Sequence, residues 1–180
     1  PQELPPGPLY VFGYGSLLWR PGFPYRHVAR ARIHGFHRAL RVWSVHHRGT
    51  EDRPGLVLGL DAGGSCLGRV FEVAEDNKVS TADYLWEREM VTHVYCPRLV
   101  RIHTQAGPLV GLTFVLDRGH DQYAGTLAPH EAARHIRNAH GYSGPNPEYV
   151  HETRAHLLEM GVEDRSLDAI ARHLDPHERP

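Results

Sequence analysis

Cysteine, lysine and long apolar runs are the scarce features of this chain. Only Cys66 and Cys96 occur in it, without a C-x-x-C pair, so we expect two reduced thiols in a cytoplasmic protein. Lys78 is the only lysine, and the arginines that supply the other positive charges form no stripe. No stretch approaches the roughly 18 to 20 apolar residues of a membrane span, and residues 1–8 lack a basic-then-apolar signal pattern.

Net charge and length narrow the function class further. The formal net charge of −1 gives no sign of a nucleic-acid or membrane binder. The 180 residues suffice for one domain with a substantial core and are short for two. We therefore predict a single domain over residues 10–174, between a loose N-terminal tail (1–9) and a C-terminal tail (175–180).

The stretch around Gly13 and Gly15 is the first candidate site. Val11 and Phe12 are typical of the end of a buried strand, and the two glycines permit backbone conformations or close approaches that a side chain would forbid. A strand that runs into such a loop presents several backbone N–H groups at one point. We expect this loop to bind a carboxylate or a developing oxyanion.

Two familiar glycine motifs are excluded at this loop. A dinucleotide fingerprint would need a third glycine where Leu18 stands, and no acidic residue follows in a βαβ context. Ser16 is not in a G-x-S-x-G elbow, because Tyr14 and Leu18 occupy the flanking positions. A serine hydrolase with Ser16 as its nucleophile is therefore not expected.

Hydrophobic patterning predicts an α+β chain, with strands first, then one helix, more strands and a group of helices. The apolar parity changes at Gly35, which favours a β-bulge or a break between two strands. Residues 61–64 are predicted to turn the chain between two further strands. The expected strands cover 29–33, 36–42, 56–60, 66–73, 95–103 and 109–116, and the expected helices cover 80–90, 129–141, 146–161 and 167–174. Asn146 is expected to be the N-cap of the third of these helices.

Glu89 is the sharpest signal from pattern alone. It shares the helical face of Ala82, Leu85, Trp86 and Met90, four apolar residues at helical spacing. Burial of a carboxylate raises its pKa, which suits a general base near neutral pH. Two other interpretations stay open.

The helical pattern could be misphased by one residue, or Glu89 could pair with an arginine such as Arg98 or Arg101. Glu87 and Arg88 lie off the stripe and can reach solvent.

The fifteen histidines do not form a metal motif. His151 and His156 are separated by one residue more than H-E-x-x-H requires, so they do not share a helical face. We predict no metal and no cofactor. Arg48, Tyr123 and Tyr149 show no functional signal by themselves, because such residues are more often a solvated charge and partly buried aromatics.

Several collinear blocks of the sequence form one pattern that runs from about Tyr10 to Leu174. The blocks are Val11–Trp19 followed by Pro21 and Phe23-Pro24, then Trp43-Ser44-x-x-His47-Arg48-Gly49-Thr50, Pro54–Leu60, Gly63–Cys66, Tyr84-Leu85-x-x-Arg88-Glu89, and Gly141-x-Ser143-Gly144-x-Asn146-x-Glu148-Tyr149. Together these blocks resemble the ChaC family of glutathione-specific γ-glutamylcyclotransferases.

The resemblance implies a γ-glutamylcyclotransferase-like fold, a small mixed β-barrel or curved sheet with packed helices. It implies Glu89 as the catalytic base and a γ-glutamyl-binding loop formed by Gly13, Tyr14, Gly15, Ser16, Leu17 and Leu18. Arg48, Tyr123 and Tyr149 become further candidate substrate contacts. The chain departs from the family pattern after Glu89, where Met90–Val94 replace glycines that members often have.

The implied reaction converts glutathione to 5-oxoproline and Cys-Gly, with no cofactor, nucleic acid, membrane or obligate protein partner. A sister cyclotransferase for other γ-glutamyl amines or dipeptides is the alternative. A non-enzymatic binding or regulatory protein is a second alternative, which Glu89 on an apolar face argues against.

Overall fold

The computed structural model describes residues 6–175, which fall into two compact units. Residues 6–38 and 60–117 form the first unit, and residues 39–59 and 118–175 form the second. Two long strands, β2 (His27–Ser44) and β3 (Gly55–Val73), contribute residues to both. Most of each predicted tail lies outside the described residues, and β1 begins at Leu9. No helix of the described chain is long and apolar enough to cross a membrane.

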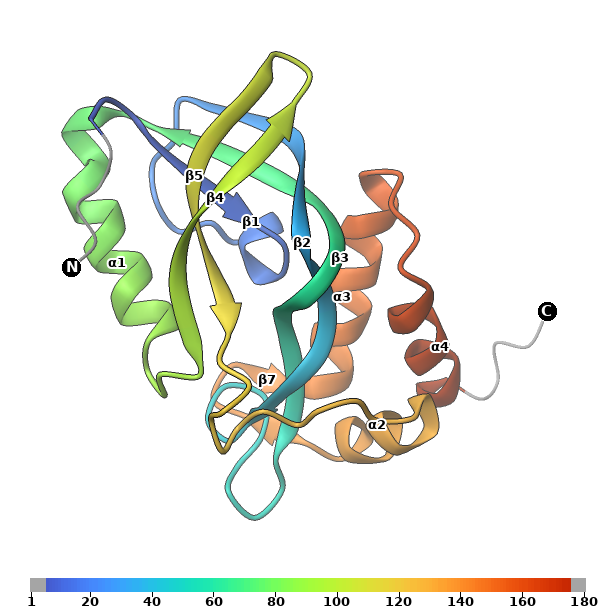
Figure 1. The fold of residues 1–180 in the computed structure, drawn as a ribbon. Coiled ribbons are helices and arrows are strands. Elements are labelled where there is room, and N and C mark those ends of the chain that lie inside the picture. Colours follow the sequence, from blue (N-terminus) through green and yellow to red (C-terminus); the bar gives the residue numbers. More distant parts are fainter. Residues whose placement is uncertain (1–5, 176–180) are drawn as a thin grey trace. The chain divides into compact units, whose positions relative to one another are not determined.

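Five strands close a small mixed barrel in the order β1-β3-β2-β4-β5 (Figure 1). Strand β1 (Leu9–Gly13) runs antiparallel to β3, with Val11 opposite Phe71, and parallel to β5, with Val11 opposite Leu112. Strands β4 (Tyr95–Thr104) and β5 (Gly107–Leu116) form an antiparallel hairpin. The α+β class and the mixed barrel are therefore confirmed.

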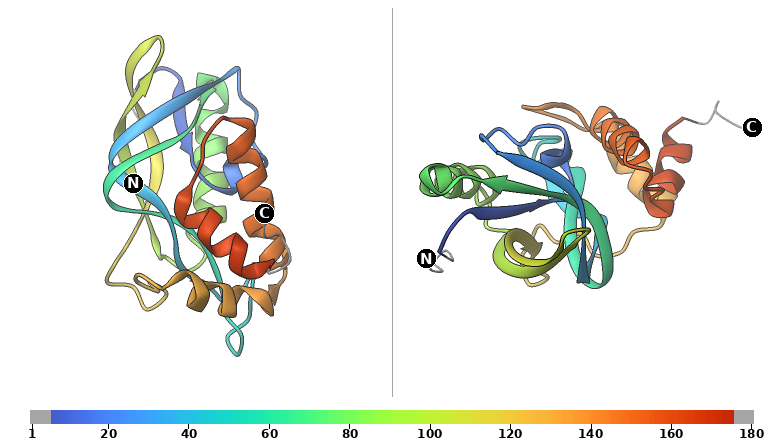
Figure 2. Two further views of the ribbon diagram at one scale, coloured as in Figure 1. Left: turned by 90° about the vertical axis from the view of Figure 1, so that its right-hand side faces the viewer. Right: turned by 90° about the horizontal axis from the view of Figure 1, so that it is seen from above.

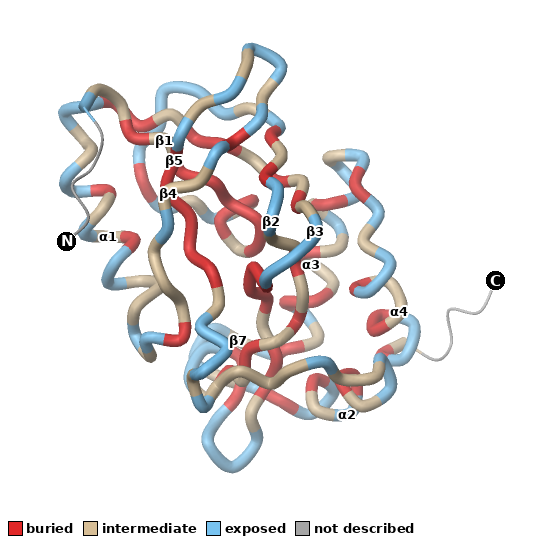
Figure 3. The backbone as a smooth tube through the Cα atoms, in the orientation of Figure 1, coloured by how far each residue is buried: buried red, intermediate tan, exposed pale blue. Residues whose placement is uncertain are grey.

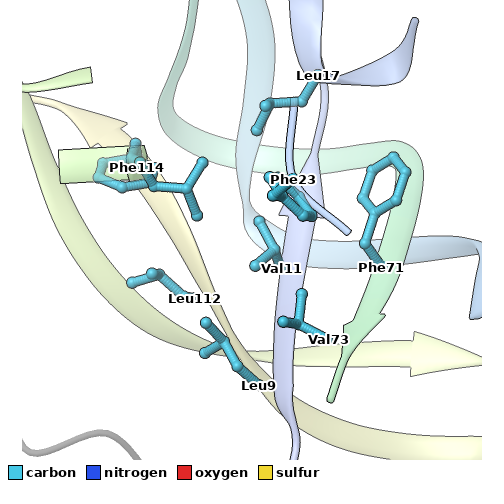
Figure 4. Close-up of a cluster of buried hydrophobic side chains, with 9 residues drawn as sticks. Leu9, Val11, Leu17, Phe23, Phe71, Val73, Leu112 and Phe114 are labelled. Carbon is cyan, nitrogen blue, oxygen red and sulfur yellow. The ribbon is translucent and has the colours of Figure 1, made fainter. Parts of the chain in front are cut away.

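A buried apolar cluster joins the barrel to helix α1 (Lys78–Glu89), which follows the short 3-10 helix η2 (Glu75–Asn77). Strand β5 supplies an uninterrupted buried run from Gly111 to Val115 (Figure 3). Leu85 of α1 is fully buried in this cluster. The cluster members are Leu9, Val11, Leu17, Phe23, Phe71, Val73, Leu85, Leu112 and Phe114 (Figure 4).

Two expectations for the strands are corrected in part. The parity change at Gly35 does not break the chain: β2 is continuous, and Gly35 has a φ of +85° inside it. The predicted turn at residues 61–64 is wrong, because β3 continues through it with positive φ at Gly63 and Gly64. Glycine lets a paired strand bend at these points without ending it.

The second unit contains three helices that pack against one another (Figure 2). They are α2 (Pro129–Arg137), α3 (Asn146–Glu159) and α4 (Arg165–Leu174), and the short strands β6 (His140–Gly141) and β7 (Gly144–Pro145) separate α2 from α3. The second predicted helix is shorter than expected and ends at Arg137. Asn146 was expected to cap α3, but its amide pairs with the backbone N–H and carbonyl of Leu56.

Candidate active site

The loop after β1 is shaped by a glycine that has no room for a side chain. Strand β1 ends at Gly13, and after two intervening residues the 3-10 helix η1 (Ser16–Leu18) begins. A Cβ on Gly13 would lie 2.9 Å from the Cβ of Leu17 and 3.2 Å from a ring carbon of Phe71. Because both neighbours are buried, the tight return of the chain over Gly13 explains the glycine.

Tyr14 is anchored at its hydroxyl and at its backbone. The ring is buried, and its hydroxyl donates to the carbonyl of Phe114 at 3.1 Å. The Tyr14 carbonyl accepts from Nε of the buried Arg38 at 2.7 Å, and the same guanidinium also donates to the Leu67 carbonyl. The barrel thus fixes the position from which the loop leaves β1.

Short hydrogen bonds between backbone groups hold the remainder of the loop. The N–H of Leu18 donates to the Gly15 carbonyl at 2.8 Å, and that of Arg20 donates to the Ser16 carbonyl at 2.8 Å. Leu17 and Leu18 are buried. The first N–H groups of such a helical turn have no hydrogen-bond acceptor within the turn, so they can donate to an oxygen of a ligand.

Glu89 is the last residue of α1, and its side chain is 16% exposed. Burial raises the pKa of its carboxyl, and the neighbouring Arg88 guanidinium opposes that rise. Arg88 Nε lies 3.4 Å from Glu89 Oε1. Within residues 6–175, Arg88 is therefore the ion-pair partner of Glu89, in place of the Arg98 or Arg101 considered from the sequence.

The apolar stripe predicted for α1 is only partly correct. Leu85 is buried, whereas Trp86 is 50% exposed, so the buried face is rotated toward Thr81 and Leu85. Arg88 was expected to be able to reach solvent. It instead turns toward the η1 loop, a contact that spans 72 positions of sequence and has no local signal.

Arg88 brings the two halves of the predicted site together. Its Nη2 donates to Ser16 Oγ at 2.8 Å, and its Nη1 donates to the Arg20 carbonyl at 2.7 Å and to the Tyr84 hydroxyl at 2.9 Å. The loop and Glu89, which the sequence analysis predicted as site residues on separate grounds, are therefore linked through one guanidinium.

The segment after Glu89 shows what replaces the glycines of the family pattern. Met90 ends α1 with its N–H on the Trp86 carbonyl. His93 then has a φ of +60°, and it is the single non-glycine residue with positive φ in the described chain. This left-handed conformation favours glycine, and histidine is among the residues that tolerate it best.

The three further candidate contacts lie in the second unit. The buried Arg48 donates from Nη1 to the Pro145 carbonyl at 3.0 Å, and its guanidinium stands 5.5 Å from the centroid of the Tyr149 ring. The Tyr149 hydroxyl accepts from the N–H of Leu58, and the Tyr123 hydroxyl accepts from Arg41. Their part in substrate binding stays a prediction.

Two of the sequence blocks converge inside this second unit. The N–H groups of Tyr142 and Ser143 donate to the carbonyls of His46 and His47, each at 2.8 Å. A Cβ on Gly141 would lie within 2.5 Å of this backbone. Within the part of the chain that the structure describes, no group of three His, Cys, Asp or Glu side chains could hold a metal ion.

Comparison with solved structures gives the class of the fold. The chain is similar to the crystal structure of a γ-glutamyl cyclotransferase specific to glutathione from yeast. The TM-score is 0.82 at 22% identity, over 96% of this chain and all of that one. The chain thus has the γ-glutamylcyclotransferase fold.

Sequence comparison gives the family. The model of the ChaC-like proteins matches residues 9–176, and the chain belongs to this family. The glutathione-specific γ-glutamylcyclotransferase of Escherichia coli K12 is 31% identical, over 91% of this chain and 71% of its own. The human glutathione-specific γ-glutamylcyclotransferase 1 is 34% identical, over 81% of this chain and 68% of its own.

Proposed function

We propose that this protein is a glutathione-specific γ-glutamylcyclotransferase, which cleaves glutathione to 5-oxoproline and Cys-Gly. The observation that carries the proposal is the largely buried Glu89 carboxyl, which Arg88 links to the Gly13–Leu18 loop. The relatives named for this reaction support the same substrate. We further propose a cytoplasmic location and no obligate protein partner.

The reaction is intramolecular, since the attacking amine and the γ-carbonyl belong to one glutamyl unit. The amine nitrogen bonds to the carbonyl carbon and closes a five-membered lactam, and the bond from that carbon to the cysteinyl nitrogen breaks. No water is consumed. Holding the folded conformer is a large part of the catalysis, because effective molarities in well-oriented systems reach on the order of 10⁵ M or more.

Glu89 would move the protons. The α-amine is mostly protonated near neutral pH, so a base must take a proton before the nitrogen can attack. An ionised Glu89 accepts that proton and returns it to the departing cysteinyl nitrogen. The attacking nitrogen loses a second proton as the lactam forms, and the amine of the released Cys-Gly takes it up to become an ammonium. A carboxyl whose pKa is raised by burial is a stronger base than an ordinary surface glutamate, which favours this exchange near neutral pH.

The loop would bind the charged part of the substrate. Backbone N–H groups of Gly13–Leu18 are proposed to hold the α-carboxylate or the oxyanion of the tetrahedral intermediate. Ser16 would position the glutamyl group, and its hydroxyl is not a nucleophile in this scheme.

The direct test incubates the purified protein with millimolar glutathione and identifies 5-oxoproline and Cys-Gly by mass spectrometry. Parallel reactions with γ-Glu-Ala and γ-Glu-Lys separate the glutathione enzyme from a sister cyclotransferase. Turnover of those compounds without turnover of glutathione would replace the proposal by the sister activity, and no lactam from any of them would remove it.

The base is tested with Glu89→Gln, which keeps the size and removes the charge. We expect kcat to fall by about 10²-fold to 10⁴-fold, with thermal unfolding still cooperative. Glu87→Gln is the matched control, since this neighbouring glutamate is exposed. Substantial activity in Glu89→Gln would place the base elsewhere.

A further inference from the structure

The Arg88 guanidinium makes contacts in three directions. Its Nε faces Glu89 Oε1 at 3.4 Å, its Nη2 reaches Ser16 Oγ at 2.8 Å, and its Nη1 reaches the Arg20 carbonyl at 2.7 Å. A guanidinium is planar, with its donors in fixed directions, so the three partners cannot move independently while all contacts are kept. An ammonium has no such geometry.

These contacts determine how the Ser16 hydroxyl is used. Arginine has donors only, so Ser16 Oγ must accept from Arg88. The one proton of that hydroxyl is then left for another acceptor, and the described residues supply none. Ser16 is therefore set as a donor toward a carboxylate or carbonyl oxygen of a ligand.

The same side chain holds both ends of the loop turn. Nη1 donates to the Arg20 carbonyl and lies 3.3 Å from that of Pro21, while the Arg20 N–H closes the turn onto the Ser16 carbonyl. Tyr84, one helical turn before Arg88, also accepts from Nη1 at 2.9 Å. The loop conformation is thus tied to the end of α1.

We propose that Arg88 is a positioning residue of the cyclotransferase site, which holds the Ser16 hydroxyl and the Glu89 carboxylate in one fixed arrangement. Arg88 acts through these two groups and not on the substrate. Its kinetic effects rest on the function proposed above, whereas its effect on the loop can be measured in the free protein.

The kinetic test compares Arg88→Gln and Arg88→Lys with the wild-type protein and with Arg98→Gln, which replaces an exposed arginine of β4. We expect kcat/KM to fall by about 10²-fold in Arg88→Gln, the loss that misplacement of a catalytic group by about 1 Å produces. Arg88→Lys should recover little, because an ammonium cannot reach all three partners. Arg98→Gln should behave as wild type.

Two readouts separate positioning from general destabilisation. In Arg88→Ala, methylguanidinium at millimolar concentration should restore part of kcat, while methylammonium should not. In a double-mutant cycle, Ser16→Ala should lower kcat/KM much less in the Arg88→Gln background than in the wild-type protein, because Arg88 then no longer orients the Ser16 hydroxyl. Additive losses together with no rescue would overturn the proposal.

The loop is tested without substrate by hydrogen exchange of the backbone amides at residues 16–20, since Pro21 has no backbone N–H. Arg88→Gln should accelerate their exchange about ten-fold, as expected from the loss of a charge-assisted hydrogen bond, and Arg98→Gln should leave it unchanged. Unchanged exchange in Arg88→Gln would refute the positioning role even in a fully active enzyme. A wild-type protein that makes no lactam, with accelerated exchange in Arg88→Gln, would refute the proposed function and retain the structural coupling.

Discussion

A single added methyl group at Gly13 tests whether the close return of the loop is required. An alanine Cβ would stand 2.9 Å from Leu17 Cβ and 3.2 Å from a Phe71 ring carbon, and ordinary van der Waals contact begins at 3.4 Å. Leu17 must therefore retreat by 3.4 − 2.9 = 0.5 Å. Both neighbours are buried, and overpacking of this kind costs about 1–3 kcal/mol.

The same displacement should reduce activity. Leu17 lies in η1 next to Ser16, and functional groups must be held within about 0.5 Å of the productive geometry. A misplacement of about 1 Å costs on the order of 10²-fold, so half of it predicts a fall of about ten-fold in kcat/KM. Urea unfolding and initial rates with glutathione measure the two effects.

Gly35→Ala is the matched control for this prediction. Gly35 has a φ of +85°, and nothing lies within 4 Å of a Cβ built there. The Gly35→Ala substitution should therefore lower the free energy of unfolding by about 1–2 kcal/mol through backbone strain alone, and kcat/KM should be unchanged. If Gly13→Ala instead kept full stability and full activity, the loop would not depend on the space above Gly13.

The features that sequence predicted well depend on neighbouring residues. The glycine loop, the α1 helix with Glu89 at its end, and the β4–β5 hairpin all have local patterns of apolar and turn residues. The resemblance to the family then supplied a mixed barrel that no local pattern specifies. Closure of the barrel pairs strands that lie far apart in the chain, and the hydrophobic periodicity of a strand does not show which other strand it pairs with.

Two of the errors share one physical origin in long-range contacts. Arg88 was interpreted as a residue that can reach solvent, because its partners, Ser16 and the Arg20 carbonyl, come from a loop far earlier in the chain. Asn146 was assigned to a helix cap, whereas its amide satisfies the backbone of Leu56, 90 positions away. A polar side chain has several possible hydrogen-bond partners, and only the tertiary structure selects among them.

Three further perturbations address single groups. Tyr14→Phe removes the hydroxyl that donates to the buried Phe114 carbonyl of β5 and should lower the free energy of unfolding by about 1–3 kcal/mol. An unchanged midpoint of urea unfolding would contradict this expectation. Asn146→Ala leaves the N–H and the carbonyl of Leu56 unpaired in a fully buried position, so we expect a loss of about 2–5 kcal/mol. The exposed Asn138→Ala should cost less than about 0.5 kcal/mol, and equal losses in the two variants would contradict the pairing. Glu89 should make stability depend on pH, because burial raises its pKa above the ordinary value of 4.5, so the folded protein holds this proton more tightly than the unfolded chain. The stability from this proton is present below pH 4.5 and is lost as the pH rises through the raised pKa. The amide side chain of Glu89→Gln does not ionise, so the variant does not lose this stability as the pH rises. The melting temperature of the variant minus that of the wild type should therefore increase from acidic to neutral pH. A difference that stays constant or decreases over this range would show that the buried carboxylate carries no such cost.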